Sequence, residues 1–418
     1  MKKRFTKSVT LIISVFFLLE CNLFAQTNFW KQINLPTGMD VFTLAINSSG
    51  HLFAGTNSSG VYRSTNDGSS WTQLSAVGGG VIKRISINSN GHLFAGTEGY
   101  GMYRSTDNGA SWSPINIGLT DTYVNGILIK TNNDLLVGTA TGGIFLSTDN
   151  GNTWTKVNTS TTISYVNAIL INSSGHILIG SGNGGVYRSA DNGNSWVQKV
   201  PGAFYAAVTS LIINSSGHLF AGSSNNGGVL RSTDNGDNWT QINSGITNLN
   251  VQALAINSNG HLFAGTFNAG VFRSTDNGNT WTQLNTGLKS VKVLSFAFST
   301  AGYIYASTGS GGVHKSNETT TDIKMIDNNI PSSFALNQNH PNPFNPETVI
   351  SWKLAASSYV QVKIYDALGR EIETLVNEYQ PAGTYQFVWQ PKNISSGIYF
   401  CILTTDKFSS FIKMMFIK

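Results

Sequence analysis

One short pattern recurs through most of the chain at a nearly constant interval. The segment Gly60-Val61-Tyr62-Arg63-Ser64 returns in variant form with its serine at positions 105, 147, 189, 232, 274 and 316, at spacings of 41, 42, 42, 43, 42 and 42 residues. Six of these seven serines open the octapeptide Ser-x-Asp-x-Gly-x-x-Trp, in which the first copy has Asn66 in place of Asp. A fixed period of this length is typical of repeat architectures whose units are supersecondary elements.

Each repeat unit contains four predicted strands. In the first unit they span Val41 to Asn47, His51 to Thr56, Gly60 to Thr65 and Trp71 to Leu74. The turns between the first two and the last two strands are rich in Gly, Asn, Asp and Ser, which accept tight-turn geometry. Four strands in about 42 residues is the size of one propeller blade. The predicted fold is therefore all-β, with a seven-bladed β-propeller over residues 26–316.

The two ends of the repeat region complete each other. The seventh unit ends at Ser316 without the Asp-x-Gly turn and without a following Trp. Near the start of the chain, Trp30-Lys31-Gln32-Ile33 matches Trp71-Thr72-Gln73-Leu74 but lacks the strands that precede it in the other units. We therefore predict that the N-terminal strand closes the last blade, which joins the ends of the ring and removes an open edge.

The octapeptide resembles the Asp-box, or BNR-type, repeat of sialidases, xyloglucanase-type glycoside hydrolases, sortilin-like receptors and photosystem assembly factors. The resemblance covers roughly residues 26–316 and implies a structural element, not a reaction. It implies that the Asp ties down the outer hairpin and that the Trp packs between blades. The structural Asp-box residues are Asp107, Asp149, Asp191, Asp234 and Asp276.

Repeated positions are weak candidates for chemistry. Five histidines share the Gly-His turn, and five arginines share one repeat position. Such residues lie around the rim of a ring and do not converge on one point, so we assign them structural roles and expect neither a metal site nor a cofactor. A sialidase binds the carboxylate of its substrate with a cluster of arginines outside the repeat. The five arginines here all occupy one repeated position and do not form such a cluster, so we exclude a sialidase.

The connections that vary between blades carry the candidate site. In an up-and-down meander the two repeated turns lie on one face of the disc and the two variable connections lie on the other, where specificity can be encoded. Aromatic and amide side chains in these loops suit a carbohydrate, since sugar rings stack on aromatic rings and hydroxyls bond amides. The ligand-binding candidates are Tyr100, Tyr123, Tyr165, Phe204, Tyr205, Asn225 and Phe267; ordinary solvated loop residues are the alternative.

Three non-repeated acids on the same face leave an enzyme open as a second hypothesis. Glycoside hydrolysis normally uses two carboxylates about 5–10 Å apart. Asp40, Glu98 and Asp121 are the weak catalytic candidates, and no hydrolase-like segment accompanies them.

The N-terminus predicts export. Four basic residues precede an apolar run from Val9 to Phe24, which is typical of a signal peptide over residues 1–25; Cys21 would be the acylated residue of a lipoprotein, but Glu20 before it disfavours that alternative. Removal of this leader lowers the number of basic residues from 26 to 22 and the number of acidic residues from 21 to 20, so nucleic-acid binding loses its main support.

Cys401 is then the single cysteine, which excludes an intramolecular disulfide.

A second domain follows a predicted linker over residues 317–332. Period-two strands separated by turn signals predict a small Ig-like β-sandwich over residues 333–418. Its markers are the Asn-x-Pro-Asn-Pro-Phe-Asn-Pro entrance, Ile364-Tyr365-Asp366, Gly369-Arg370, Gly397-Ile398-Tyr399 and the closing Lys413-Met414. This combination resembles the type A sorting domain of the type IX secretion system. The resemblance implies passage across the outer membrane of a Gram-negative bacterium, with the secretion machinery as partner, and release or attachment at the surface.

The leading hypothesis is a secreted or cell-surface propeller that binds a polymer, with carbohydrate favoured, or a protein through its loop face. The second hypothesis is a secreted polysaccharide-degrading hydrolase, and the third is a purely structural surface protein. We expect a monomer, no integral membrane segment in the mature chain and no nucleic-acid partner. Neither the fold nor a sorting signal names the ligand.

Overall fold

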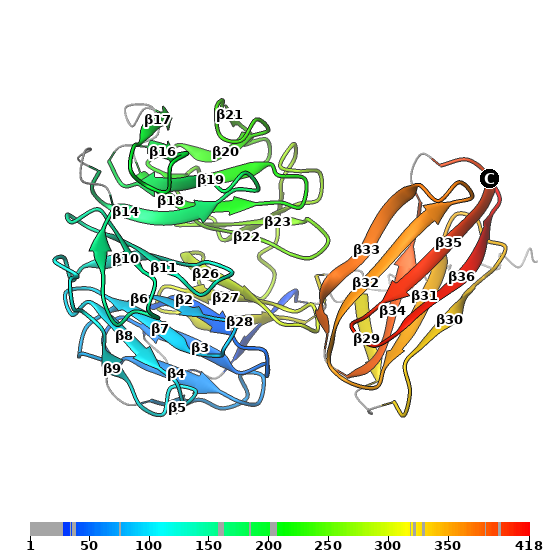
Figure 1. The fold of residues 1–418 in the computed structure, drawn as a ribbon, viewed down its shortest axis with the longest axis horizontal. Helices are drawn as coiled ribbons and strands as arrows, with labels where there is room; N and C mark the ends of the chain where they lie inside the picture. The colour runs from blue at the N-terminus through cyan, green and yellow to red at the C-terminus, as the bar shows by residue number, and fades with distance from the viewer. Residues whose placement is uncertain are drawn as a thin grey trace, which may run out of the picture.

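The computed structural model describes residues 28–33, 35, 39–74, 77–157, 163–183, 185–200, 207–317, 319–320, 323–327, 331–380, 382–391 and 394–418. All the elements in these ranges are β-strands (Figure 1). The predicted signal peptide lies outside the described residues. Within the described residues, no helix has the length and apolar character needed to cross a membrane.

The first part of the described chain forms seven four-stranded antiparallel sheets, each counted here as one blade. Blade 1 contains β2 (Val41–Ile46), β3 (Leu52–Thr56), β4 (Val61–Ser64) and β5 (Thr72–Gln73), and blade 2 contains β6 (Ile82–Ile87), β7 (Leu93–Thr97), β8 (Met102–Ser105) and β9 (Ser113–Pro114). Blade 3 contains β10 (Val124–Ile129), β11 (Leu135–Thr139), β12 (Ile144–Ser147) and β13 (Thr155–Lys156).

The same order continues in the next three blades. Blade 4 contains β14 (Val166–Ile171), β15 (Ile177–Ser181), β16 (Gly185–Ser189) and β17 (Val197–Val200). Blade 5 contains β18 (Ala207–Ile213), β19 (Leu219–Ser224), β20 (Gly228–Ser232) and β21 (Thr240–Gln241). Blade 6 contains β22 (Val251–Ile256), β23 (Leu262–Thr266), β24 (Val271–Ser274) and β25 (Thr282–Gln283).

The last blade combines both ends of the propeller. It contains β26 (Val293–Phe298), β27 (Ile304–Thr308), β28 (Gly312–Ser316) and, as its outer strand, β1 (Trp30–Ile33). β1 pairs antiparallel with β28, so that Trp30 lies opposite Ser316. The predicted closure by the N-terminal strand is confirmed. The innermost strands also contact one another in sequence, and β2 contacts β26 as well as β6, which closes the ring.

Packing between blades depends on a small residue in the second strand of each blade. The segment Leu-Phe-Ala-Gly-Thr of β3 is fully buried. A Cβ atom on Gly55 would lie 2.6 Å from Cγ2 of Ile82 in the next blade. Blades 2 to 6 each have a Gly at this position too, followed by a buried Val at the start of the next inner strand. The glycine therefore lets neighbouring sheets approach closely, as dense interior packing requires.

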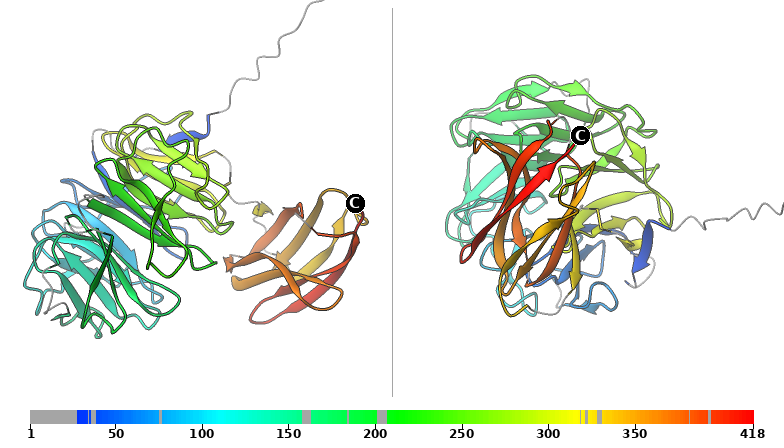
Figure 2. Two further views of the ribbon diagram at one scale, coloured as in Figure 1. Left: turned by 90° about the horizontal axis from the view of Figure 1, so that it is seen from above. Right: turned by 90° about the vertical axis from the view of Figure 1, so that its right-hand side faces the viewer.

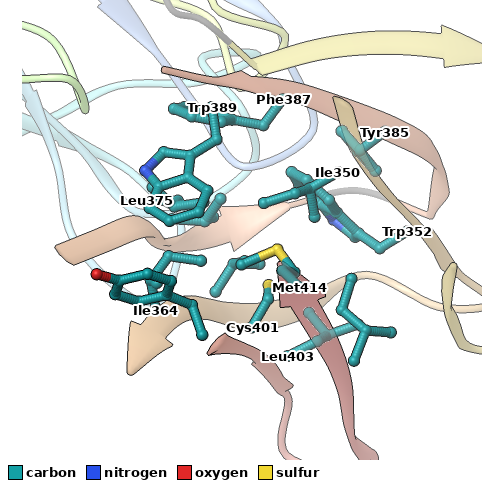
Figure 3. Packing of buried hydrophobic residues seen from close by; sticks show 14 of the residues in the cluster. Ile350, Trp352, Ile364, Leu375, Tyr385, Phe387, Trp389, Cys401, Leu403 and Met414 are labelled. Carbon is teal, nitrogen blue, oxygen red and sulfur yellow. The ribbon is translucent and has the colours of Figure 1, made fainter. Parts of the chain in front are cut away.

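A two-sheet sandwich follows the propeller (Figures 1 and 2). One sheet has the order β29 (Ile323–Asp327), β34 (Gly383–Trp389), β31 (Thr348–Leu354), β30 (Ala335–His340), and the other has β33 (Glu371–Gln380), β32 (Ser358–Asp366), β35 (Gly397–Thr404), β36 (Ser409–Phe416). Inward residues alternate with outward ones, as in β31. Trp352 stacks on Tyr385 with ring centroids 5.8 Å apart, and Cys401 is a buried free thiol in the same core (Figure 3). The all-β prediction of a propeller followed by a sandwich is confirmed.

The segment predicted as a linker contains ordered structure. β29 lies inside residues 317–332 and pairs with β34, so the sandwich takes one strand from this range. Thr320 is buried against the propeller, where its amide donates to the Gly302 carbonyl at 2.8 Å and its carbonyl accepts from Asn257 Nδ2 at 2.6 Å. The sequence did not indicate these contacts, because Thr320 lies in the polar run Asn317-Glu318-Thr319-Thr320-Thr321, which has no strand pattern.

Candidate functional site: the loop face and the central channel

Each Asp-box carboxylate is held within its own turn. In blade 2, Asp107 Oδ1 accepts from Ser105 Oγ at 2.7 Å and from the Ser111 amide at 2.9 Å, while Oδ2 accepts from Ser111 Oγ at 2.6 Å. These bonds close the hairpin between β8 and β9, which is what the proposed structural role requires. In blade 3, Trp154 donates its indole N–H to the Ile115 carbonyl of blade 2 at 2.6 Å, so this Trp joins two blades.

The two repeated turns lie on one face, which we call the turn face. Arg63 of blade 1 donates to the Asn108 carbonyl in the Asp-box turn of blade 2 at 2.9 Å. Asn47, in the first turn of blade 1, donates to Asn108 Oδ1 at 3.2 Å. Arg104, Arg188 and Arg231 repeat the arginine contact in later blades. The shared arginines therefore connect successive blades and are not available to a ligand on the opposite face.

The opposite face, which we call the loop face, carries the variable connections. Asp40 precedes β2 there and bridges blades 1 and 7. Its Oδ2 lies 3.1 Å from Lys292 Nζ, and its Oδ1 accepts from the Ser310 amide at 2.7 Å. Burial raises the pKa of Asp40, but the hydrogen bonds from Lys292 and Ser310 outweigh it and hold the pKa below its ordinary value. The Asp40 carboxylate is therefore ionised and joins blade 1 to blade 7.

Asp121 is the most thoroughly satisfied of the three candidate acids. Only 8% of its surface is exposed, and its Oδ1 accepts from the Tyr123 amide at 3.0 Å. Its Oδ2 accepts from the amides of Thr141 and Gly142 at 2.6 and 2.7 Å, and from the Thr141 hydroxyl at 2.9 Å. Burial raises the pKa of Asp121, but these bonds hold it below its ordinary value. Asp121 therefore attaches the segment that enters blade 3 to the loop between β11 and β12 of the same blade.

Glu98 lies in a loop of blade 2 and pairs with Lys83 at 3.0 Å. Lys83 Nζ also lies 4.6 Å from the centroid of the Phe42 ring. The three candidate acids therefore have separate partners: Asp40 holds Ser310 and Lys292, Asp121 holds backbone amides, and Glu98 holds Lys83. A glycosidase needs one carboxyl to donate a proton and a second to attack or to activate water. Backbone amides hold Asp40 and Asp121, whereas Glu98 has a 42% exposed side chain and one ion pair.

Three candidate tyrosines form a continuous row on the loop face, which we call the tyrosine arc: Tyr100, Tyr123 and Tyr165. Each is 50% exposed. The backbone links them in order, because the Gly101 amide donates to the Thr122 carbonyl at 2.9 Å, and Ala140 donates to the Tyr123 carbonyl at 2.9 Å and accepts from the Tyr165 amide at 2.6 Å. The arc therefore spans blades 2 to 4.

Tyr165 has an unusual backbone conformation within this arc. Its φ is +51°, a left-handed conformation that costs energy for a bulky residue. Besides the bond to Ala140, its carbonyl accepts from the Gly182 amide at 2.7 Å. These bonds fix the residue, so its ring stands on a rigid support.

The remaining candidates are more scattered. Phe267, in a loop of blade 6, is 37% exposed and lies 5.4 Å from Lys292 Nζ. Asn225 is an exposed residue of a blade 5 turn, with φ +55°. Phe204 and Tyr205 lie outside the described residues. Of the candidates that are described, only the tyrosine arc forms a continuous group.

A ring of residues that was not predicted from the sequence lies at the entrance of the central channel. In each blade, the residue that follows the first repeated apolar position of the innermost strand lines a cavity of about 220 Å³ at the loop-face end of these strands. This ring, the channel mouth, consists of Phe42, Lys83, Asn125, Asn167, Thr209, Gln252 and Leu294. The signal was present, because each of these varied residues directly follows an apolar residue near the start of an inner strand, which is Val in six blades and Ile in blade 2.

Two family matches cover most of the chain. Residues 88–337 match the family described as photosynthesis system II assembly factor YCF48, which is more than half of the chain. The chain belongs to this family. Residues 339–418 match the secretion system C-terminal sorting domain, which confirms the predicted type IX sorting domain. The sorting domain identifies a secreted or cell-surface protein of a Gram-negative bacterium, as predicted. No curated protein matches the chain.

Solved structures of low sequence identity share the fold. PorZ, a surface component of the type IX secretion system of Porphyromonas gingivalis, is 16% identical with a TM-score of 0.56; the match covers 91% of this chain and 59% of PorZ. YCF48 bound to D1 peptide is 18% identical with a TM-score of 0.59, covering 71% and 97%. Virginiamycin B lyase from Staphylococcus aureus, an enzyme, is 17% identical with a TM-score of 0.59, covering 68% and 98%. This chain therefore spans less than two thirds of PorZ.

Proposed function

We propose that this protein is an extracellular binding module whose propeller holds an extended polysaccharide across the tyrosine arc. The observation that carries the proposal is the arc itself: three half-exposed rings on connections that backbone hydrogen bonds join to one another. Flat aromatic rings stack on the apolar faces of sugars, and the amides of the channel mouth suit hydroxyl groups. The sorting domain supports a role outside the cell.

The engagement of the acids supports binding without hydrolysis. Asp40 and Asp121 accept backbone hydrogen bonds, and Glu98 pairs with Lys83. A retaining or inverting mechanism needs two available carboxyl groups, so at least one of the backbone-bound carboxylates, Asp40 or Asp121, would have to be released. We therefore expect no release of reducing ends from plant or microbial polysaccharides. Release that is lost in Asp121→Asn, in a variant still folded by circular dichroism, would favour the hydrolase.

A protein segment is the second candidate ligand. The specific observation in its favour is that a structure with the same fold is YCF48 bound to D1 peptide. Exposed tyrosines and amides on a rigid surface also suit an extended peptide. Polysaccharide ranks first here because the arc presents three half-exposed aromatic rings, on which the apolar faces of sugar rings can stack.

The test is retention on immobilised polysaccharides. We expect Tyr100→Ala and Tyr123→Ala each to weaken binding about threefold to tenfold, because one aromatic contact contributes about 0.5–1.5 kcal/mol. Tyr359→Ala is the matched control, since Tyr359 is 48% exposed but lies in the sandwich. Retention that is equal in all three variants, or no retention on any polysaccharide of the panel, would contradict the proposal. Retention of a peptide array that depends on the arc would replace the polysaccharide with a protein ligand.

A further inference from the structure

Arg84 breaks the pattern of the innermost strands. It is the third residue of β6 and lies opposite Gly96 of β7. The residues in the same register position of the other blades are all small: Thr43, Gly126, Ala168, Ser210, Ala253 and Ser295. One long cationic side chain therefore stands in a ring of small residues.

In three other blades, the small residue at the position of Arg84 accepts a hydrogen bond from the backbone of the next blade. Thr43 Oγ1 accepts from the Ile85 amide of the next blade at 3.2 Å, and Ser210 and Ser295 make the same contact with Leu254 and Leu44 at 3.1 and 3.2 Å. A guanidinium has no acceptor and cannot replace this contact. Arg84 instead lines the central channel, at the channel mouth and in the adjoining cavity of about 190 Å³ below it.

The guanidinium of Arg84 has few partners in the protein. Its Nη1 donates to the Lys83 carbonyl at 3.0 Å, and no ion pair joins Arg84 to a carboxylate of the described residues. No Asp or Glu is among the residues that line either cavity. The nearby Glu98 is paired with Lys83. Burial lowers the pKa of Arg84. A guanidinium with five donors and no counter-ion, at the wall of a channel, is a binding group for an anion.

A carboxylate matches this site. A guanidinium binds a carboxylate through two parallel hydrogen bonds. The surrounding channel mouth offers the amide of Asn125 to hydroxyl groups, together with the amide oxygens of Asn167 and Gln252, whose NH2 groups donate to the Val208 carbonyl and to Asn250 Oδ1. Asn125 and Asn167 follow Tyr123 and Tyr165 by two residues, so the channel opens beside the tyrosine arc. A ligand lying on the arc can therefore extend a side group toward Arg84.

We propose that Arg84 makes the central channel a carboxylate-binding site, and that its ligand is a uronic acid residue of the polysaccharide held by the tyrosine arc. The identity of the polymer rests on the proposed function, whereas the carboxylate site rests on Arg84 and the channel alone. An acidic peptide could present the same group, and the experiment separates the two sources.

The direct test observes Arg84 in the full-length protein. The Nε–H resonance of Arg84 is assigned by its loss in Arg84→Ser, a variant that restores the residue type found in blades 5 and 7. We expect this resonance to shift on addition of D-galacturonate and to stay unchanged with D-galactose, which lacks the carboxylate. No shift with galacturonate would overturn the carboxylate site, whatever the loop face binds.

The second test measures affinity for oligogalacturonate by calorimetry. We expect Arg84→Ser to weaken binding about tenfold or more, because a charge-assisted hydrogen bond is lost. Lys156→Ser, which removes a positive charge from the exposed outer strand β13, should leave the affinity unchanged. Loss of binding in the tyrosine variants but not in Arg84→Ser would keep the proposed function and overturn this inference. Arg84-dependent binding of an oligoaspartate peptide in preference to oligogalacturonate would overturn the uronic acid.

Discussion

Replacing Asp121 by Asn should destabilise the propeller far more than the same change at Asp40. Whichever way the new amide turns, its NH2 group faces a backbone donor: either the Tyr123 amide, or the amides of Thr141 and Gly142, which now donate to Oδ2 at 2.6 and 2.7 Å. A buried donor left without an acceptor costs about 1–3 kcal/mol, so we expect a loss of about 3 kcal/mol in the free energy of unfolding.

Asp40→Asn is the matched control. Its Oδ1 can still accept from the Ser310 amide, and only the ion pair with the partly exposed Lys292 is lost. Such a pair is worth less than about 1 kcal/mol. Urea unfolding followed by tryptophan fluorescence measures both variants. With a slope of about 3 kcal/mol per molar urea, Asp121→Asn should unfold about 1 M earlier than wild type. Equal midpoints for the two variants would refute the assignment of Asp121 as a backbone anchor.

Three further predictions concern the ring. The Thr153 side chain and amide lower the pKa of Asp149 to about 2, and three other Asp-box carboxylates have a similarly lowered pKa. The stability that these carboxylates provide is therefore present above the unfolded pKa of 3.8 and is lost as pH falls from about 4 to about 2. The thermal midpoint should fall over this pH range, and a constant midpoint would contradict the prediction. Gly245→Ala should lower the thermal midpoint, because φ is +97° and the new Cβ would lie 2.1 Å from the Trp281 carbonyl oxygen. Trp30→Phe should weaken ring closure by removing the indole bond to the Leu284 carbonyl at 2.6 Å, seen as faster proteolysis than in wild type, whereas an equal cleavage rate would count against it.

Local patterns predicted the fold well. The turn residues and the alternating apolar positions are repeated in each unit, so the strands and the exchange of β1 follow from the sequence alone. The partners of the candidate acids could not be predicted in this way. Asp40 meets Ser310, which is distant in sequence, and Asp121 meets Thr141 across one blade. Such contacts depend on the exact path of variable loops, for which period and propensity carry no information.

The candidate site was predicted in part. Exposed tyrosines could be located because they lie in the variable connections, but their order along the arc depends on backbone bonds through Ala140. Arg84 was missed for a different reason. Its significance appears only when strands of different blades are placed in register, so that one Arg is compared with six small residues.

The exchanged strand β1 also affects the order in which the ring can assemble. Blades 1 to 6 of the propeller each consist of four consecutive strands. In blade 7, β1 can pair with β28 only after all the intervening blades have been synthesised. Long-range pairing is slow because the entropy of loop closure must be overcome first. Until then the outer edge of β28 is an unpaired template, and the β1 of a neighbouring molecule can occupy it as well as its own. Crowded refolding should therefore produce strand-swapped oligomers from this seam before any other edge.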